Sequence, residues 1–103
     1  MPVSNLSPIP SSSYVQAVTA TASGIGASNI PGSANYAEGF VRLNSVVETR
    51  DGTTPTATLG KQWDIGDIIL LRSRDELVGF SAIEQSSTDA SINWEFFNQT
   101  PGG

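Results

Sequence analysis

The chain is divided into short segments rich in β-branched and aromatic residues, which are separated by clusters of glycine, proline, asparagine and aspartate. The clearest segment is "SINWEFFN", residues 91–98, in which apolar Ile92, Trp94 and Phe96 alternate with the residues between them. A period of two places alternate side chains on opposite faces of a strand. No segment has a convincing period of 3.6 residues, which an amphipathic helix requires. The sequence therefore predicts an all-β fold.

The segments are numerous and short, as in a small antiparallel β-sandwich or barrel. About six or seven strands of about 5 to 8 residues are expected, which is the content of such folds. One helical turn is expected after Ser73, a suitable N-cap, because Asp75 and Glu76 favour the first turn of a helix. The strands are expected within residues 14–22, 39–44, 45–50, 68–72, 76–85 and 91–98, with an edge or irregular segment at 53–60.

The beginning of the chain is unlike the rest, because no charged residue occurs before Glu38. Three prolines, Pro2, Pro8 and Pro10, disfavour a helix and favour extended backbone in residues 1–13. We therefore expect an extended N-terminal arm.

Length and net charge bound the domain count and the partners. With 103 residues we expect a single domain, in which residues 1–35 supply the arm and the first strand and residues 36–103 the body. The net charge of −5 opposes attraction to phosphate backbones and anionic membrane surfaces, so neither nucleic acid nor membrane is an expected partner. No apolar run approaches the ~18 residues of a membrane span. The first residues lack the features of a signal peptide, so a soluble, uncleaved chain is expected.

The chain contains neither histidine nor cysteine. Their absence removes the commonest general base near neutral pH, the commonest transition-metal ligand, disulfides and thiol chemistry. We therefore expect no catalytic residues, no cofactor and no enzymatic activity.

The stretch "ETRDGTTPTATLGKQWDIGD" concentrates acidic residues among glycines and threonines. Asp51-Gly52 and Gly66-Asp67 are predicted to form a turn scaffold, because glycine adopts positive φ and aspartate bonds to nearby backbone amides. A calcium site built from Asp51, Asp64, Asp67 and nearby threonine hydroxyls remains an alternative, since calcium requires several converging oxygen ligands. A pair of carboxylates flanking a sugar cleft has no supporting motif.

Apolar residues on both faces of one predicted strand suggest an additional contact. In "IILL", residues 68–71, both faces must be covered, either by a loop or the arm folded over the outer face or by a neighbouring subunit. Phe97 beside Phe96 poses the same question, and Trp63 and Trp94 are expected to be core or interface anchors rather than sugar platforms.

The run "FVRLN…VETRDGTTPTATLGKQWDIGDIILLRSRDELVGFSAI" and the alternating aromatic strand after it resemble small virion proteins of tailed bacteriophages. The resemblance covers about Phe40 to Phe97 and consists of a strand, a "DGTxPT" turn, a "GD" turn, an apolar strand and an "S-x-DEL-x-x-F-x-AI" segment. The matching positions are Asp51, Gly52, Thr53, Pro55, Thr56, Gly60, Gly66, Asp67, Ser73, Asp75, Glu76, Leu77, Phe80, Ala82 and Ile83.

This resemblance implies a non-enzymatic structural component of the virion, assembled in the host cytoplasm. The expected role is that of a capsid decoration or cement protein, which stabilises the assembled head by binding it. The implied partners are the major capsid protein or neighbouring virion subunits, and a homo-oligomer is expected. The residues hypothesised to form interfaces are Val3, Leu6, Ile9, Tyr14, Ile25, Ile30, Ile69, Leu71 and Phe97.

Two other functions remain open. A carbohydrate-binding or receptor-binding module of a tail or head surface would use Trp63, Trp94 or Tyr36 to stack a sugar ring, and it requires an exposed tryptophan beside polar groups. A small calcium-stabilised enzyme subunit would depend on Asp51 and Asp67.

Overall fold

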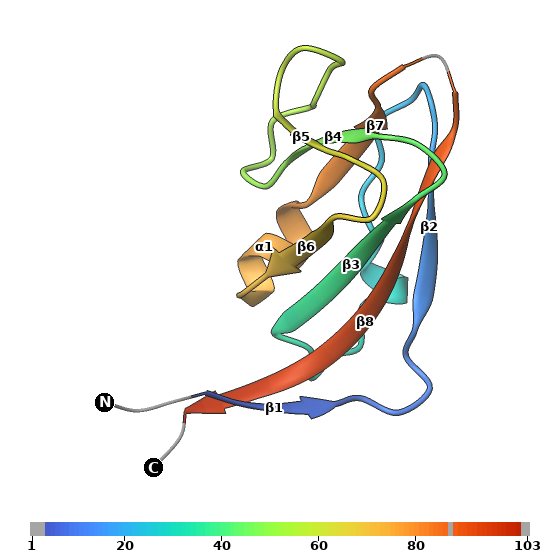
Figure 1. The fold of residues 1–103 in the computed structure, drawn as a ribbon. Coiled ribbons are helices and arrows are strands. Elements are labelled where there is room, and N and C mark those ends of the chain that lie inside the picture. The colour runs from blue at the N-terminus through green and yellow to red at the C-terminus, as the bar shows by residue number, and fades with distance from the viewer. Residues whose placement is uncertain (1–3, 87, 102–103) are drawn as a thin grey trace.

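A computed structural model describes residues 4–86 and 88–101 and shows an all-β protein of eight strands in two antiparallel sheets. The larger sheet has the order β1-β8-β3-β6, with β2 also paired to β8, and the smaller sheet has the order β5-β4-β7 (Figure 1). The predicted all-β sandwich is confirmed. The strands are β1 (Ser4–Pro8), β2 (Tyr14–Val18), β3 (Tyr36–Arg42), β4 (Val46–Thr49), β5 (Lys61–Trp63), β6 (Ile68–Leu71), β7 (Ser81–Glu84) and β8 (Ala90–Pro101).

Two short helical elements accompany the strands. The 3-10 helix η1 (Ala27–Asn29) lies in the loop between β2 and β3, and α1 (Arg74–Gly79) connects the two sheets between β6 and β7. The predicted helix start is confirmed, since the Ser73 side chain accepts a hydrogen bond from the Glu76 amide at 3.2 Å. No helix among the described residues has the length and hydropathy of a membrane span.

The last strand, β8, organises the larger sheet. Its N-terminal part pairs with β2, from Val18 opposite Ala90 to Tyr14 opposite Trp94, and its C-terminal part pairs with β1. On its other edge it pairs with β3, which in turn pairs with β6. The beginning and the end of the chain are therefore joined in one sheet.

The core lies between the sheets and is centred on Trp94, which is fully buried. Its ring packs edge to face against Phe80 with centroids 5.0 Å apart. The indole Nε1 donates to Oε1 of buried Gln16 at 2.9 Å, and Gln16 Nε2 donates to the Ser23 carbonyl oxygen at 2.9 Å. The polar atoms of both buried side chains are thus hydrogen-bonded, as burial requires.

A glycine in β3 makes room for this indole. A Cβ on Gly39 would lie 2.6 Å from Cζ3 of Trp94 and 2.8 Å from Cγ2 of Ile92. We expect Gly39→Ala to lower the free energy of unfolding by about 1–3 kcal/mol, the usual cost of overpacking a core. Urea unfolding measures the change. Gly32→Ala is the matched control, because nothing lies within 4 Å of its added Cβ, and equal stability of the two variants would contradict the prediction.

Candidate functional site

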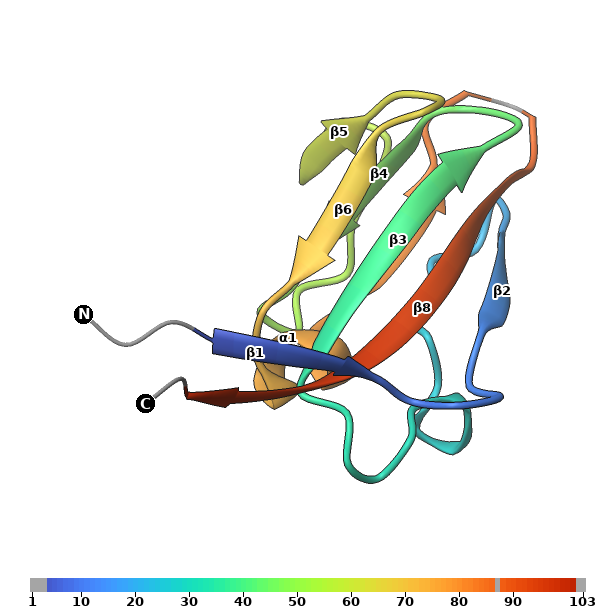
Figure 2. The ribbon, with the colours of Figure 1, turned by 60° about the horizontal axis from the view of Figure 1, so that its bottom comes forward.

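A two-stranded ribbon formed by β1 and the end of β8 extends along one side of the body (Figure 2). In it Leu6 lies opposite Gln99 and Ser7 opposite Asn98. Beyond Phe97, β8 has no further partner residue in β3. This part of β8 is therefore held mainly by β1 and by the loop before β3.

The side chain of Asn35 continues the sheet where β3 ends. Its backbone amide donates to the Phe97 carbonyl at 3.1 Å, its Oδ1 accepts from the Gln99 amide at 2.5 Å, and its Nδ2 donates to the Gln99 carbonyl at 2.9 Å. One asparagine thus closes the β8 edge that β3 leaves open. Its role was not predicted, since nothing in the local pattern "SANY" distinguishes it from any other asparagine in a loop.

The outer edge of β1 is open. No strand among the described residues pairs with it, its side chains from Asn5 to Pro8 are exposed, and all residues of the strand are uncharged. Leu6 is 41% exposed. An uncharged open edge presents unpaired backbone donors and acceptors to any extended chain that approaches it. A two-stranded ribbon is also only marginally stable alone, so an added strand would stabilise it.

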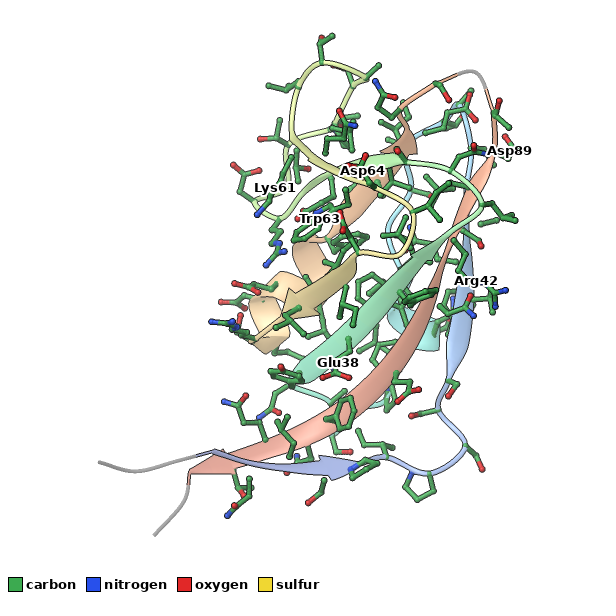
Figure 3. The ribbon with its side chains drawn as sticks, in the orientation of Figure 1. Glu38, Arg42, Lys61, Trp63, Asp64 and Asp89 are labelled. Carbon is green, nitrogen blue, oxygen red and sulfur yellow. The ribbon has the colours of Figure 1, made fainter. Side chains whose placement is uncertain are left out.

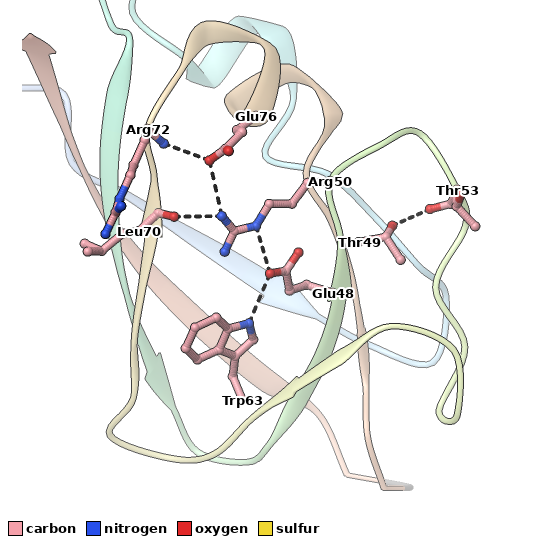
Figure 4. A network of polar contacts seen from close by, with 8 residues as sticks. All are labelled: Glu48, Thr49, Arg50, Thr53, Trp63, Leu70, Arg72 and Glu76. Carbon is pink, nitrogen blue, oxygen red and sulfur yellow. Dashed lines mark hydrogen bonds and ion pairs between the residues drawn. The ribbon is translucent and has the colours of Figure 1, made fainter.

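The edges of β6 and β7 are blocked by side chains or by loops. At β6, Arg50 Nη1 donates to the Leu70 carbonyl oxygen at 2.9 Å and Oε1 of Glu76 accepts from the Arg72 amide at 2.8 Å (Figure 4). At β7, the Ala82 backbone exchanges hydrogen bonds with Ser23 at 2.9 and 3.0 Å. Of the two remaining edge strands, β5 has three residues and carries a lysine, whereas β2 pairs among the described strands with β8 alone and is, like β1, uncharged.

The side chains at the β6 edge belong to a network around a buried carboxylate. Glu48 is 3% exposed, and its Oε1 accepts from Arg50 Nε at 2.9 Å and from Trp63 Nε1 at 3.1 Å (Figure 4). Arg50 Nη1 also contacts Oε1 of Glu76 at 3.2 Å. The other oxygen of Glu48, Oε2, has no donor among the described residues. The arginine therefore pairs with the carboxylate that β4 buries.

The structure places the hypothesised interface residues of the arm in different environments. Leu6 lies on the exposed ribbon, whereas Ile9 and Tyr14 are partly buried against the core. Ile25 and Ile30 are core residues, 2% and 6% exposed. Their assignment to an interface is corrected, because the loop before β3 folds them into the protein's own core. Val3 lies outside the described residues.

The two residues of β6 assigned to an interface also require correction. Ile69 and Leu71 are fully buried, and the outward residues of this strand are Ile68 and Leu70. The run is apolar on both faces, so its sequence did not indicate which face was inward. Phe97 is half-buried and packs edge to face against Tyr36, with centroids 5.8 Å apart.

The four turn residues occupy tight turns. Gly52 and Gly66 have φ of +88° and +90°, values that favour glycine. Asp51 Oδ1 accepts from the Thr53 amide at 3.0 Å, and this backbone hydrogen bond holds the pKa of the Asp51 carboxyl below its usual value. Asp67 Oδ2 accepts from the backbone amide of Asp64 at 2.8 Å.

The next residues are those named for the alternative calcium site and for the alternative sugar-stacking site. Asp64 Oδ1 accepts from Ser45 and Gln62, both at 3.0 Å, and the described residues include no group of three or more acidic side chains positioned to hold a metal ion. Of the two tryptophans, Trp94 is fully buried, whereas Trp63 is half-buried with Nζ of Lys61 4.4 Å from its ring centroid.

Comparison of the chain with models of protein families, with curated proteins and with solved structures finds no match.

Proposed function

We propose that this protein is a non-enzymatic structural subunit that attaches to a larger assembly by strand addition at the open edge of β1. The observation that carries the proposal is the contrast between the edge of β1 and the edges of β6 and β7. The edge of β1 is extended, exposed and uncharged, whereas Arg50 and Glu76 block β6 and Ser23 covers β7. Strand addition uses main-chain hydrogen bonds for affinity and alternate side chains for specificity.

The assembly that we propose is a bacteriophage virion, with this chain as a capsid decoration or cement protein. Support comes from the sequence resemblance over residues 40–97 and from the lack of histidine and cysteine for the commonest catalysis. The partner would be the major capsid protein or a neighbouring virion subunit, which supplies one extended segment. Binding the assembled shell and not its free subunits would stabilise the shell by mass action.

A proline in the ribbon tests the backbone contact directly. The Ile9 amide donates to the Phe96 carbonyl oxygen, and alternate amides of an antiparallel strand point to the same side. The Leu6 amide therefore points away from β8. We expect Leu6→Pro to remove this outward donor, leave the β1–β8 pairing intact, and reduce the occupancy of the protein on purified virions at least tenfold.

The matched control for this variant is Leu6→Ala, which removes the side chain and keeps the amide. Deletion of residues 2–8 should abolish occupancy while circular dichroism and thermal unfolding of the body remain close to wild type. Residues from Ile9 onward are kept, since Ile9 packs against the core. Unchanged occupancy of both the proline and the deletion variants would exclude the β1 edge as the attachment site.

The carbohydrate-binding alternative has less support from the geometry. Trp94 is buried, Tyr36 packs against Phe97, and one face of the Trp63 ring carries the Lys61 ammonium. A sugar ring stacking on that face would have to displace the lysine. A glycan array probed with the purified protein is expected to give no hits.

A further inference from the structure

The outward face of the larger sheet and the neighbouring β6 edge carry charged groups of opposite sign in separate places. Across the strands, Glu95 of β8 lies opposite Glu38 of β3, and Glu38 lies opposite Leu70 of β6. In the next row, Asn93 lies opposite Phe40 and Phe40 opposite Ile68. Glu38 and Glu95 thus lie on one side of an apolar centre, which is formed by Phe40, Ile68 and Leu70.

The acidic pair lies in a hollow. Its volume is about 470 Å³, and its lining includes Glu38, Glu95, Val15, Phe40 and Ile68. The three apolar side chains are 59%, 44% and 56% exposed, respectively. An acidic hollow with apolar walls fits a long cationic side chain, because its methylene groups pack on the walls while its charge reaches the carboxylates.

The two carboxylates are unfavourably placed in the isolated chain. Like charges directly opposite each other in an antiparallel pair are destabilising, and the ion pairs among the described residues join Arg50 to Glu48 and Glu76 and do not include Glu38 or Glu95. A cation supplied from outside the chain would relieve this repulsion.

Cationic side chains lie on the other side of the apolar centre. A second hollow, of about 330 Å³, is lined by Arg50, Lys61, Arg72 and the single carboxylate of Glu76, together with Trp63, Ile68 and Leu70. The two arginines and the lysine are three of the chain's five basic residues. Arg50 is held by Glu48 and Glu76, whereas Lys61 and Arg72 are exposed. Figure 3 shows Lys61 beside Trp63 on β5 and Glu38 on β3.

We infer that this face is the contact between two copies of the chain related by a two-fold axis. In such an interface a residue that contacts another across the axis is contacted by it in return. An acidic hollow, an apolar centre and a basic hollow in series are complementary to the same series turned by 180°. Lys61 and Arg72 of one copy enter the acidic hollow of the other, and Ile68 and Leu70 pack near the axis.

This dimer does not depend on the proposed function, because no residue that lines the two hollows belongs to β1. The experiment that tests it uses two charge-reversed variants, Glu38→Lys/Glu95→Lys and Lys61→Glu/Arg72→Glu. Sedimentation of the wild type over a concentration series is expected to show a monomer–dimer equilibrium that weakens with salt, since part of the contact is electrostatic. Each variant alone is expected to dimerise at least tenfold more weakly, because like charges then face each other in both halves of the contact.

An equimolar mixture of the two variants is expected to restore the dimer as a one-to-one heterodimer, since both halves of the contact are then complementary. Folding of each variant is checked by circular dichroism. The control is Asp89→Lys, in the connection between β7 and β8 (Figure 3). It changes the net charge by as much as one Glu→Lys substitution and should dimerise as wild type. Arg42→Glu, on the same face beyond Phe40, should do so too.

A wild type that stays monomeric, variants that dimerise as well as wild type, or a mixture that stays monomeric would each overturn the inference. Loss of the dimer in Arg42→Glu but not in Lys61→Glu/Arg72→Glu would show that Lys61 and Arg72 are not the cations that enter the acidic hollow. This outcome would overturn the inference as well. The variant lacking residues 2–8 should remain dimeric, which separates this contact from attachment through the ribbon.

Discussion

Trp94→Ala is expected to lower the free energy of unfolding by about 3–5 kcal/mol, the range for removing a large aromatic side chain from a core. The indole is fully buried, packs on Phe80 and fills the space above Gly39. A small domain has about 5–15 kcal/mol of stability in total. The variant should therefore unfold at a much lower urea concentration, or be partly unfolded at 37 °C.

Trp94→Phe separates packing from hydrogen bonding in this prediction. It retains an aromatic ring but removes the donor to Oε1 of Gln16, which is itself buried. An unsatisfied buried acceptor costs about 1–3 kcal/mol. The double variant Trp94→Phe/Gln16→Leu should recover part of this loss. Stability of Trp94→Ala within about 1 kcal/mol of wild type would show that this residue is not at the centre of the core.

Arg50→Ala is expected to be the second most damaging change, because it leaves the Glu48 carboxylate buried without its cation. We expect a loss of about 3 kcal/mol, the low end of the range for breaking a buried ion pair, since the Arg50 side chain is 29% exposed. The variant also exposes the Leu70 carbonyl oxygen on the β6 edge. Arg42→Ala, which removes an exposed arginine, is the control and should change stability by less than about 0.5 kcal/mol.

Replacing both members of the pair provides the decisive comparison. Glu48→Met/Arg50→Met removes the buried charge together with its partner, and such replacements are often close to neutral. The double variant should therefore be more stable than Arg50→Ala when both are unfolded in urea. If the double variant is the less stable of the two, the lost packing and hydrogen bonds of Arg50 and not the unpaired charge explain the damage.

The fold class was predictable because the alternation in residues 91–98 is regular and one of its faces is almost entirely apolar. The same rule did not indicate which face of residues 68–71 is inward, since both are apolar, and the structure resolves it in favour of Ile69 and Leu71. The strand at Ser4–Pro8 was expected as an extended arm, because its composition is uncharged and proline-rich and its partner is at the other end of the chain.

The groups proposed to bind partners were not predictable for a related reason. Glu38 and Glu95 are 57 positions apart in sequence and become neighbours through the β3–β8 register. Buried Glu48 gives no sequence signal, since a carboxylate in a strand is expected on the solvent face. Register between distant strands is set by the whole core, so single segments do not reveal it.

The position of β8 after all the other described strands has a consequence for biosynthesis. Since β1, β2 and β3 all pair with this strand, the larger sheet cannot assemble until β8 itself has left the ribosome. Pairings between such distant segments form slowly. The uncharged strands β1 and β2 therefore remain unpaired until β8 is synthesised. During this time they are most exposed to association with other nascent chains.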